Sequence, residues 1–172
     1  MVIDLREFEE FPVTVELEAK PGEIGPFVDS VSRVDRVAFR LSLQKSGEEY
    51  FCQGRASASV QMICSRCAGS FEAELAEATD FIIRSDVLPK PSELGALDSE
   101  DYVYTHGGGA LADVTDMVRQ ALVLAVDMKP LCREGCKGLC PTCGTNLNER
   151  TCQCVRASSD GRWDDLKGLL QN

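Results

Sequence analysis

The amino-acid sequence predicts an α+β protein with an antiparallel β-sheet, one main helix and a C-terminal cysteine-rich tail. Three observations carry this prediction. Several segments between residues 11 and 75 alternate apolar and polar residues, one segment shows helical periodicity, and eight of the nine cysteines fall into close pairs. The length of 172 residues favours one domain, or one domain with a small appendage.

Residues 1–83 are predicted to form the antiparallel sheet region, which contains a first Cys-x-x-Cys motif. Residues 11–20 alternate as a half-buried strand does, and a clearer alternation starts at Val37. After a turn at 46–48, a returning strand leads directly into Cys64, and a further strand starts at Phe71. Residues 81–83 either continue that last strand or form a short one of their own.

Residues 84–112 are expected to be an acidic, flexible crossing segment, because they contain two prolines, five acids and three consecutive glycines. Residues 113–130 are predicted to be a helix that packs on the sheet. Asp113 is a suitable N-cap, Pro130 stops the helix, and an apolar stripe runs from Val114 to Ala125. Residues 131–172 form the cysteine-rich tail, with a possible closing helix around Trp163.

The interpretation of the cysteines depends on the cellular compartment of the protein. Its N-terminus has acids where an export signal would have basic residues, and no apolar run approaches the roughly 20 residues of a membrane helix. We therefore expect a bacterial cytoplasmic protein without membrane contact. Because the cytoplasm is reducing, closely paired cysteines indicate metal ligands rather than disulfides.

Four cysteine pairs fit two closed, tetrahedral zinc sites, since Zn²⁺ binds four thiolates at about 2.3 Å. The spacing favours one site from the tail and one that joins the end of a strand to the segment after the helix. The first set is Cys140, Cys143, Cys152 and Cys154, and the second is Cys64, Cys67, Cys132 and Cys136. In an alternative pairing, Cys132 or Cys136 exchanges with the tail cysteines, and Cys64 and Cys67 are reduced thiols or a redox pair. The ninth cysteine, Cys52, is predicted to be a core thiol.

The order of these features resembles the YceD family of large ribosomal RNA subunit accumulation proteins. The resemblance rests on CSRC before a Phe-containing strand, on an acidic crossing, on a helix opening DVTDMVRQAL and on the block LCREGCKGLCPTCGTNLNERTCQC. It covers most of the chain and is most specific in residues 131–154. It implies a role in making or stabilising large-subunit ribosomal RNA, and it brings no established enzymatic activity. Some relatives keep only the first cysteine motif, which fits two separable metal sites.

Charge separates two functional hypotheses. The chain has a formal net charge of −10, but residues 129–172 contain 7 basic and 5 acidic groups. The first hypothesis is a non-enzymatic zinc protein that binds large-subunit ribosomal RNA or a basic ribosomal protein, with Arg133, Lys137, Arg150 and Arg156 around the metal. The second is a protein-binding adaptor or chaperone-like module without RNA contact. We predict no catalytic residues and no small-molecule substrate, and we expect the single histidine, His106, to lie at the surface.

Overall fold

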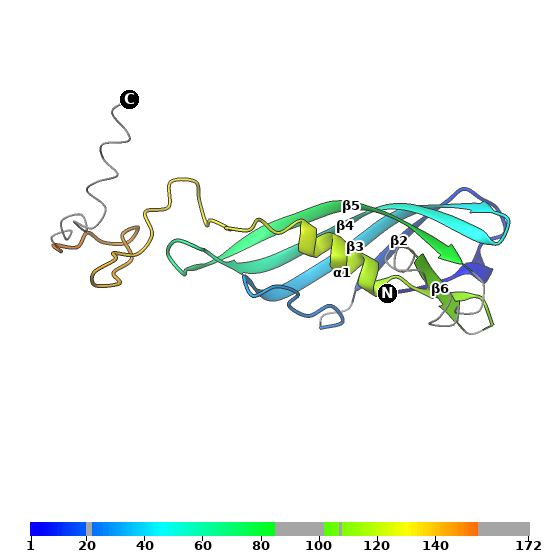
Figure 1. The fold of residues 1–172 in the computed structure, drawn as a ribbon, viewed down its shortest axis with the longest axis horizontal. Coiled ribbons are helices and arrows are strands. Elements are labelled where there is room, and N and C mark those ends of the chain that lie inside the picture. Colours follow the sequence, from blue (N-terminus) through cyan, green and yellow to red (C-terminus); the bar gives the residue numbers. More distant parts are fainter. Residues whose placement is uncertain (20–21, 85–101, 107, 155–172) are drawn as a thin grey trace, which may run out of the picture. The chain divides into compact units, whose positions relative to one another are not determined.

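The computed structural model describes residues 1–19, 22–84, 102–106 and 108–154 (Figure 1). The chain divides into two compact units. The sheet unit comprises Met1–Ser65 and Gly69–Cys132. The cysteine-rich unit comprises Arg66–Ala68 and the residues from Arg133 onward, of which 133–154 are described. The predicted closing helix around Trp163 lies outside the described residues.

The sheet unit contains a seven-stranded sheet in the order β1-β7-β6-β5-β4-β3-β2. Neighbouring strands are antiparallel except for β5 and β6, which are parallel. A 3₁₀ turn, η1, follows β1. The elements are β1 (Val2–Asp4), η1 (Leu5–Glu7), β2 (Val13–Ala19), β3 (Val31–Ser46), β4 (Glu49–Ile63), β5 (Ser70–Arg84), β6 (Tyr102–His106), β7 (Leu111–Asp113) and α1 (Thr115–Leu124).

Three long strands, β3, β4 and β5, form the centre of this sheet (Figure 1). Their apolar side chains alternate as the sequence predicts, so that one face is buried. On β3 the buried residues include Val37, Phe39, Leu41 and Leu43, and on β4 they include Ala56, Ala58, Val60 and Met62. Because this face supplies most of the apolar core, it fixes the register of all three strands.

The structure is mostly sheet rather than a balanced α+β fold, because the strands are longer and more numerous than the sequence patterns indicate. β3 begins at Val31, before the predicted start, and two register irregularities occur in its first residues. These irregularities interrupt the alternation and hide the start of the strand from a period-two search. Residues 81–83 continue β5, since the β4–β5 pairing is unbroken from Ser70 to Arg84.

The expected crossing segment 84–112 contains regular structure. Residues 102–106 form β6, which pairs with β5, and residues 111–113 form β7. Residues 85–101, which hold the five acids, lie outside the described residues. Gly108 and Gly109 lie in the turn between β6 and β7 and have φ values of 79° and 83°. His106 is exposed at the end of β6, as predicted.

Helix α1 packs on β4 and β5 with Val118, Ala121 and Leu122 buried. The N-cap is Val114 rather than the predicted Asp113. The Asp113 carboxylate still accepts a hydrogen bond of 3.0 Å from the Thr115 backbone N–H in the first turn. The helix is shorter than predicted, since it ends at Leu124 and not near Pro130. Ala125 is the C-cap of the helix, and Val126 packs on the apolar core beyond the helix end. Among the described residues, no helix has the length and apolar character to span a membrane.

One glycine of β4 is required by packing. A Cβ atom on Gly54 would lie 2.6 Å from Cε2 of Phe39 and 2.9 Å from Cβ of Leu41. The Phe39 ring is almost fully buried and stacks on Phe81, with 6.3 Å between the ring centroids. The ring therefore occupies the space above Gly54 and has no room to move away.

Gly54→Ala should lower the free energy of unfolding by about 1–3 kcal/mol, because the new methyl group displaces the Phe39 ring in a filled core. Gly25→Ala is the control, since a Cβ there meets nothing within 4 Å. Chemical denaturation of both variants measures the difference. Equal stability of the two variants would contradict the steric explanation.

Candidate metal centres

The first candidate centre lies wholly in the cysteine-rich unit and consists of Cys140, Cys143, Cys152 and Cys154. Their four sulfur atoms all lie within 4.8 Å of one another. Four thiolates at about 2.3 Å from a tetrahedral zinc are about 3.8 Å apart, so the arrangement fits this ion. All four donors are cysteines, which leaves no position for water once the tetrahedron is complete.

A tight turn positions the first two of these sulfurs. The backbone N–H of Cys140 donates to the Thr145 carbonyl at 2.8 Å, and the Gly144 N–H donates to the Cys140 carbonyl at 2.9 Å. Gly144 has a φ of 71°, in the left-handed region that glycine adopts without steric cost. The turn therefore brings Cys140 and Cys143 to the same side of the centre, as the Cys-Pro-Thr-Cys-Gly motif predicts.

The surroundings of Cys140 and Cys143 favour ionised sulfur, whereas those of Cys154 oppose it. Backbone N–H groups of Cys143 and Thr142 lower the pKa of Cys140 to about 6. The Thr145 hydroxyl, whose oxygen lies 3.2 Å from the Cys143 sulfur, lowers the pKa of Cys143. The pKa of Cys154 rises to about 12, chiefly because Cys143 is so close. Thiols this crowded resist full ionisation without a cation between them, and a divalent metal supplies that cation.

The Cys64–Cys67 motif adopts the same turn. The Cys64 N–H donates to the carbonyl of the residue five positions later, Gly69, at 2.9 Å, just as Cys140 does to Thr145. Ala68 occupies the place of Gly144 and has a φ of 53°. An alanine gives no sequence signal for a left-handed residue, so sequence reasoning missed this equivalence. The repeated spacing of the two motifs is the signal that could have shown it.

The second candidate centre consists of Cys64, Cys67, Cys132 and Cys136, whose sulfur atoms also lie within 4.8 Å of one another. Within the cysteine-rich unit, the Arg66 guanidinium donates to the Cys136 carbonyl at 3.2 Å. The Leu139 N–H donates to the Arg66 carbonyl at 3.1 Å. Gly138 permits this approach, because a Cβ there would lie 2.9 Å from the Arg66 carbonyl oxygen.

The structure thus brings the eight paired cysteines into the two groups that their spacing favours. The alternative exchange of Cys132 or Cys136 with the tail pairs is not the grouping found. That the eight sulfurs are metal ligands remains a prediction. Sequence reasoning also missed three polar residues that organise the loop between the tail pairs, namely Thr145, Asn146 and Asn148.

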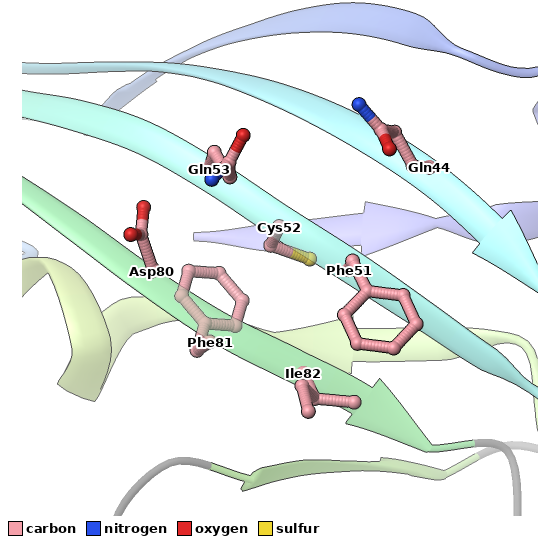
Figure 2. A pocket seen from close by; sticks show the side chains of 7 residues that line it. All are labelled: Gln44, Phe51, Cys52, Gln53, Asp80, Phe81 and Ile82. Carbon is pink, nitrogen blue, oxygen red and sulfur yellow. The ribbon is translucent and has the colours of Figure 1, made fainter.

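A hollow on the sheet contains the ninth cysteine (Figure 2). Its lining comes from β3, β4 and β5 and consists of Gln44, Phe51, Cys52, Gln53, Asp80, Phe81 and Ile82. Cys52 is 1% exposed, and burial raises its pKa to about 12. Its thiol therefore stays protonated near neutral pH and is a core group, as predicted, rather than an activated nucleophile.

Three of the four basic residues expected around the metal lie in the described part of the cysteine-rich unit. Arg133, Lys137 and Arg150 are all exposed. Arg133 donates to the side-chain oxygen of Asn148 at 2.8 Å. Arg156 lies outside the described residues.

Comparisons with known proteins agree with the sequence pattern. A family model described as large ribosomal RNA subunit accumulation protein YceD matches residues 52–170. A relative from Arabidopsis thaliana, named large ribosomal RNA subunit accumulation protein YCED homolog 1, chloroplastic, is 32% identical over 75 residues, which are 44% of this chain and 23% of that protein. A Zea mays protein of the same name is 26% identical over 133 residues, covering 63% of this chain and 44% of that protein. The chain thus spans less than half the length of these relatives. No solved structure matches it.

Because the left-handed residue is glycine in one turn and alanine in the other, we expect Gly144→Ala and Ala68→Gly to affect metal affinity differently. Gly144→Ala should weaken binding at its centre about fivefold, because alanine in the left-handed region costs about 1 kcal/mol when the turn forms. Ala68→Gly should not weaken binding, since it relieves the same strain. Chelator competition on the zinc-loaded protein measures both. Gly135→Ala is the control, because a Cβ there meets nothing within 4 Å. An equal loss in the control would exclude the conformational explanation.

Proposed function

We propose a zinc-binding, non-enzymatic function for this chain, which belongs to the YceD family of large ribosomal RNA subunit accumulation proteins. In this function the protein supports the accumulation or assembly of large-subunit ribosomal RNA. The main support for this proposal is the presence of two four-cysteine groups, each with its sulfur atoms within 4.8 Å of one another. The family match includes all eight of these cysteines, since it covers residues 52–170.

The donor sets support zinc in a structural role, with two ions per chain. Thiolate-only tetrahedral sites are typical of structural zinc, whereas catalytic zinc keeps a position for water or substrate. When bound, zinc supplies bonds that hold distant parts of the chain together. The chain's own residues orient the sulfurs through the two turns and through polar neighbours such as the Thr145 hydroxyl. This arrangement serves folding rather than chemistry on a substrate.

The cysteine-rich unit is the part best suited to contact RNA. Residues 1–128 contain 11 basic and 23 acidic groups, whereas residues 129–172 contain 7 basic and 5 acidic groups. Lys137 and Arg150 are exposed and belong to the unit that the metal would order. Because phosphate contacts come mainly from Lys and Arg, we place the RNA-binding surface here.

A second candidate partner is a basic ribosomal protein. One face of β5 carries the exposed acids Glu72, Glu74 and Asp80. Such a surface complements a positively charged polypeptide and repels phosphate. The adaptor function without RNA contact would act through this surface. A reducing compartment such as the cytoplasm fits either function, because both need thiolates that are not oxidised.

The protein purified without added metal should contain two zinc ions per chain by elemental analysis. The double variant Cys140→Ser, Cys143→Ser should contain one, and its residues 133–154 should become protease-sensitive, because metal binding there acts as folding free energy. Cys52→Ala is the matched control and should keep two ions, since Cys52 belongs to neither group. A metal-free parent protein would refute the proposal.

Association with large-subunit particles or their RNA should depend on charge in the cysteine-rich unit. Lys137→Glu combined with Arg150→Glu should weaken binding and lower the slope of log affinity against log salt by about two units, because each substitution removes one cation that pairs with a phosphate. Lys45→Glu combined with Arg119→Glu changes the net charge equally on the sheet unit and should leave the slope unchanged. Measuring each association with and without RNase separates the candidates. Binding that survives RNase and is abolished when Glu72, Glu74 and Asp80 are reversed would favour the protein partner instead.

A further inference from the structure

Asn148 stands out among the residues between the two tail pairs, because both ends of its side chain are engaged. Its oxygen, Oδ1, accepts hydrogen bonds from the Arg133 guanidinium at 2.8 Å and from the Lys137 backbone N–H at 2.9 Å. Its nitrogen, Nδ2, donates to Oδ1 of Asn146 at 2.8 Å and lies 3.4 Å from the Cys136 sulfur. A carboxamide has two donors and two acceptor lone pairs, so all its capacity is used.

The contacts themselves determine which end of this carboxamide faces the sulfur. A guanidinium and a backbone N–H can only donate, so the atom that meets Arg133 and Lys137 has to be the oxygen. The NH₂ group then points at Cys136 and donates to its sulfur. An N–H donor aimed at a cysteine ligand stabilises the thiolate form that a metal needs.

Asn148 is held by a loop whose ends belong to the other cysteine group. It lies between Cys143 and Cys152, so a metal bound by those two cysteines would close the loop around it. Inside the loop, Oδ1 of Asn146 accepts from the Asn148 backbone N–H at 3.0 Å. The Leu147 N–H donates to the Gly138 carbonyl at 2.9 Å, which attaches the loop to the segment that carries Cys136.

We propose that Asn148 is a positioning residue that couples the two metal centres, because it is fixed by the loop of one centre and donates a hydrogen bond to Cys136 of the other. This inference rests on the proposed zinc binding. A metal at the Cys140 centre orders the loop and places the NH₂ group against Cys136, which strengthens binding at the second centre. Coupling between binding sites is reciprocal, so the second metal favours the first to the same extent. The two ions are therefore taken up cooperatively.

The test compares metal affinities in a double-mutant cycle on the full-length chain. Co²⁺ replaces zinc as the probe, because its thiolate complexes absorb visible light, and chelator competition gives the affinities. The four proteins are the parent, Asn148→Ala, the double variant Cys140→Ser, Cys143→Ser, and the combination of all three substitutions. In the parent background, Asn148→Ala should weaken the Cys136 centre about 10- to 100-fold and separate uptake into two steps. In the background of Cys140→Ser and Cys143→Ser, Asn148→Ala should cause little further loss of affinity at the Cys136 centre, because no metal at the Cys140 centre closes the loop.

Two more variants test the donor role of the side chain. Asn148→Asp keeps an oxygen for Arg133 and Lys137 but removes the NH₂ group that meets Cys136 and Asn146 and adds a carboxylate beside the thiolates, so it should lose at least as much affinity as Asn148→Ala. Thr151→Ala changes an exposed residue of the same loop and should behave like the parent. Parent-like affinity of Asn148→Asp would overturn the role of the donor, and an equal loss from Asn148→Ala in both backgrounds would overturn the coupling. A parent protein that binds no metal would instead refute the proposed function, and this inference with it.

Discussion

The cysteine-rich unit has to hold its shape without an apolar core, and this constraint governs its whole architecture. Within residues 133–154, the fully buried residues are Cys136, Gly138 and Cys140. Leu139, one of the few large apolar side chains there, is 40% exposed. Ordering each residue costs about 1–2 kcal/mol of backbone conformational entropy, and so little buried surface cannot offset that cost. Bonds from sulfur to a metal are the interaction that can, which explains why the polar contacts of this unit converge on cysteines.

The sheet unit, by contrast, has a large apolar core. Its core side chains, such as Phe39, Leu41 and Leu43, are at most 1% exposed, so burial of apolar surface stabilises it without a metal. The two Cys-x-x-Cys motifs share one local backbone arrangement. In each, a left-handed residue follows the second cysteine, and the first cysteine's N–H bonds five residues ahead. Glycine makes this turn easy at 144, whereas Ala68 shows that a small side chain is accepted where the surrounding contacts determine the backbone.

The sequence predicts the features that arise from residues close together in the chain, and it misses those that depend on residues far apart. The β4 alternation and the cysteine grouping follow from local spacing, and both are found. The strands β6 and β7 were not predicted, because residues 102–113 are short and glycine-rich and become strands only through pairing with β5 and β1. Asn148 could not be identified as a positioning residue, since a surface asparagine in a loop has no sequence pattern that reveals its partner.

Charge links the metal centres to the choice of partner. A zinc ion with four thiolates has a net charge of −2, so two such centres lower the formal net charge of the chain from −10 to −14. The exposed cations Arg133, Lys137 and Arg150 lie in the same unit as six of these eight thiolates and would partly neutralise them. Arg133 is also engaged with Asn148, although a guanidinium has five N–H donors and most of them stay available to phosphate. In the proposed function, metal binding would act on RNA affinity in two opposed ways, since it would add negative charge and also fix the positions of the few cations. Salt screens the added charge beyond about 8 Å at physiological ionic strength, whereas a phosphate contact needs a cation in a fixed position, so the proposed RNA binding requires ordering to be the larger effect.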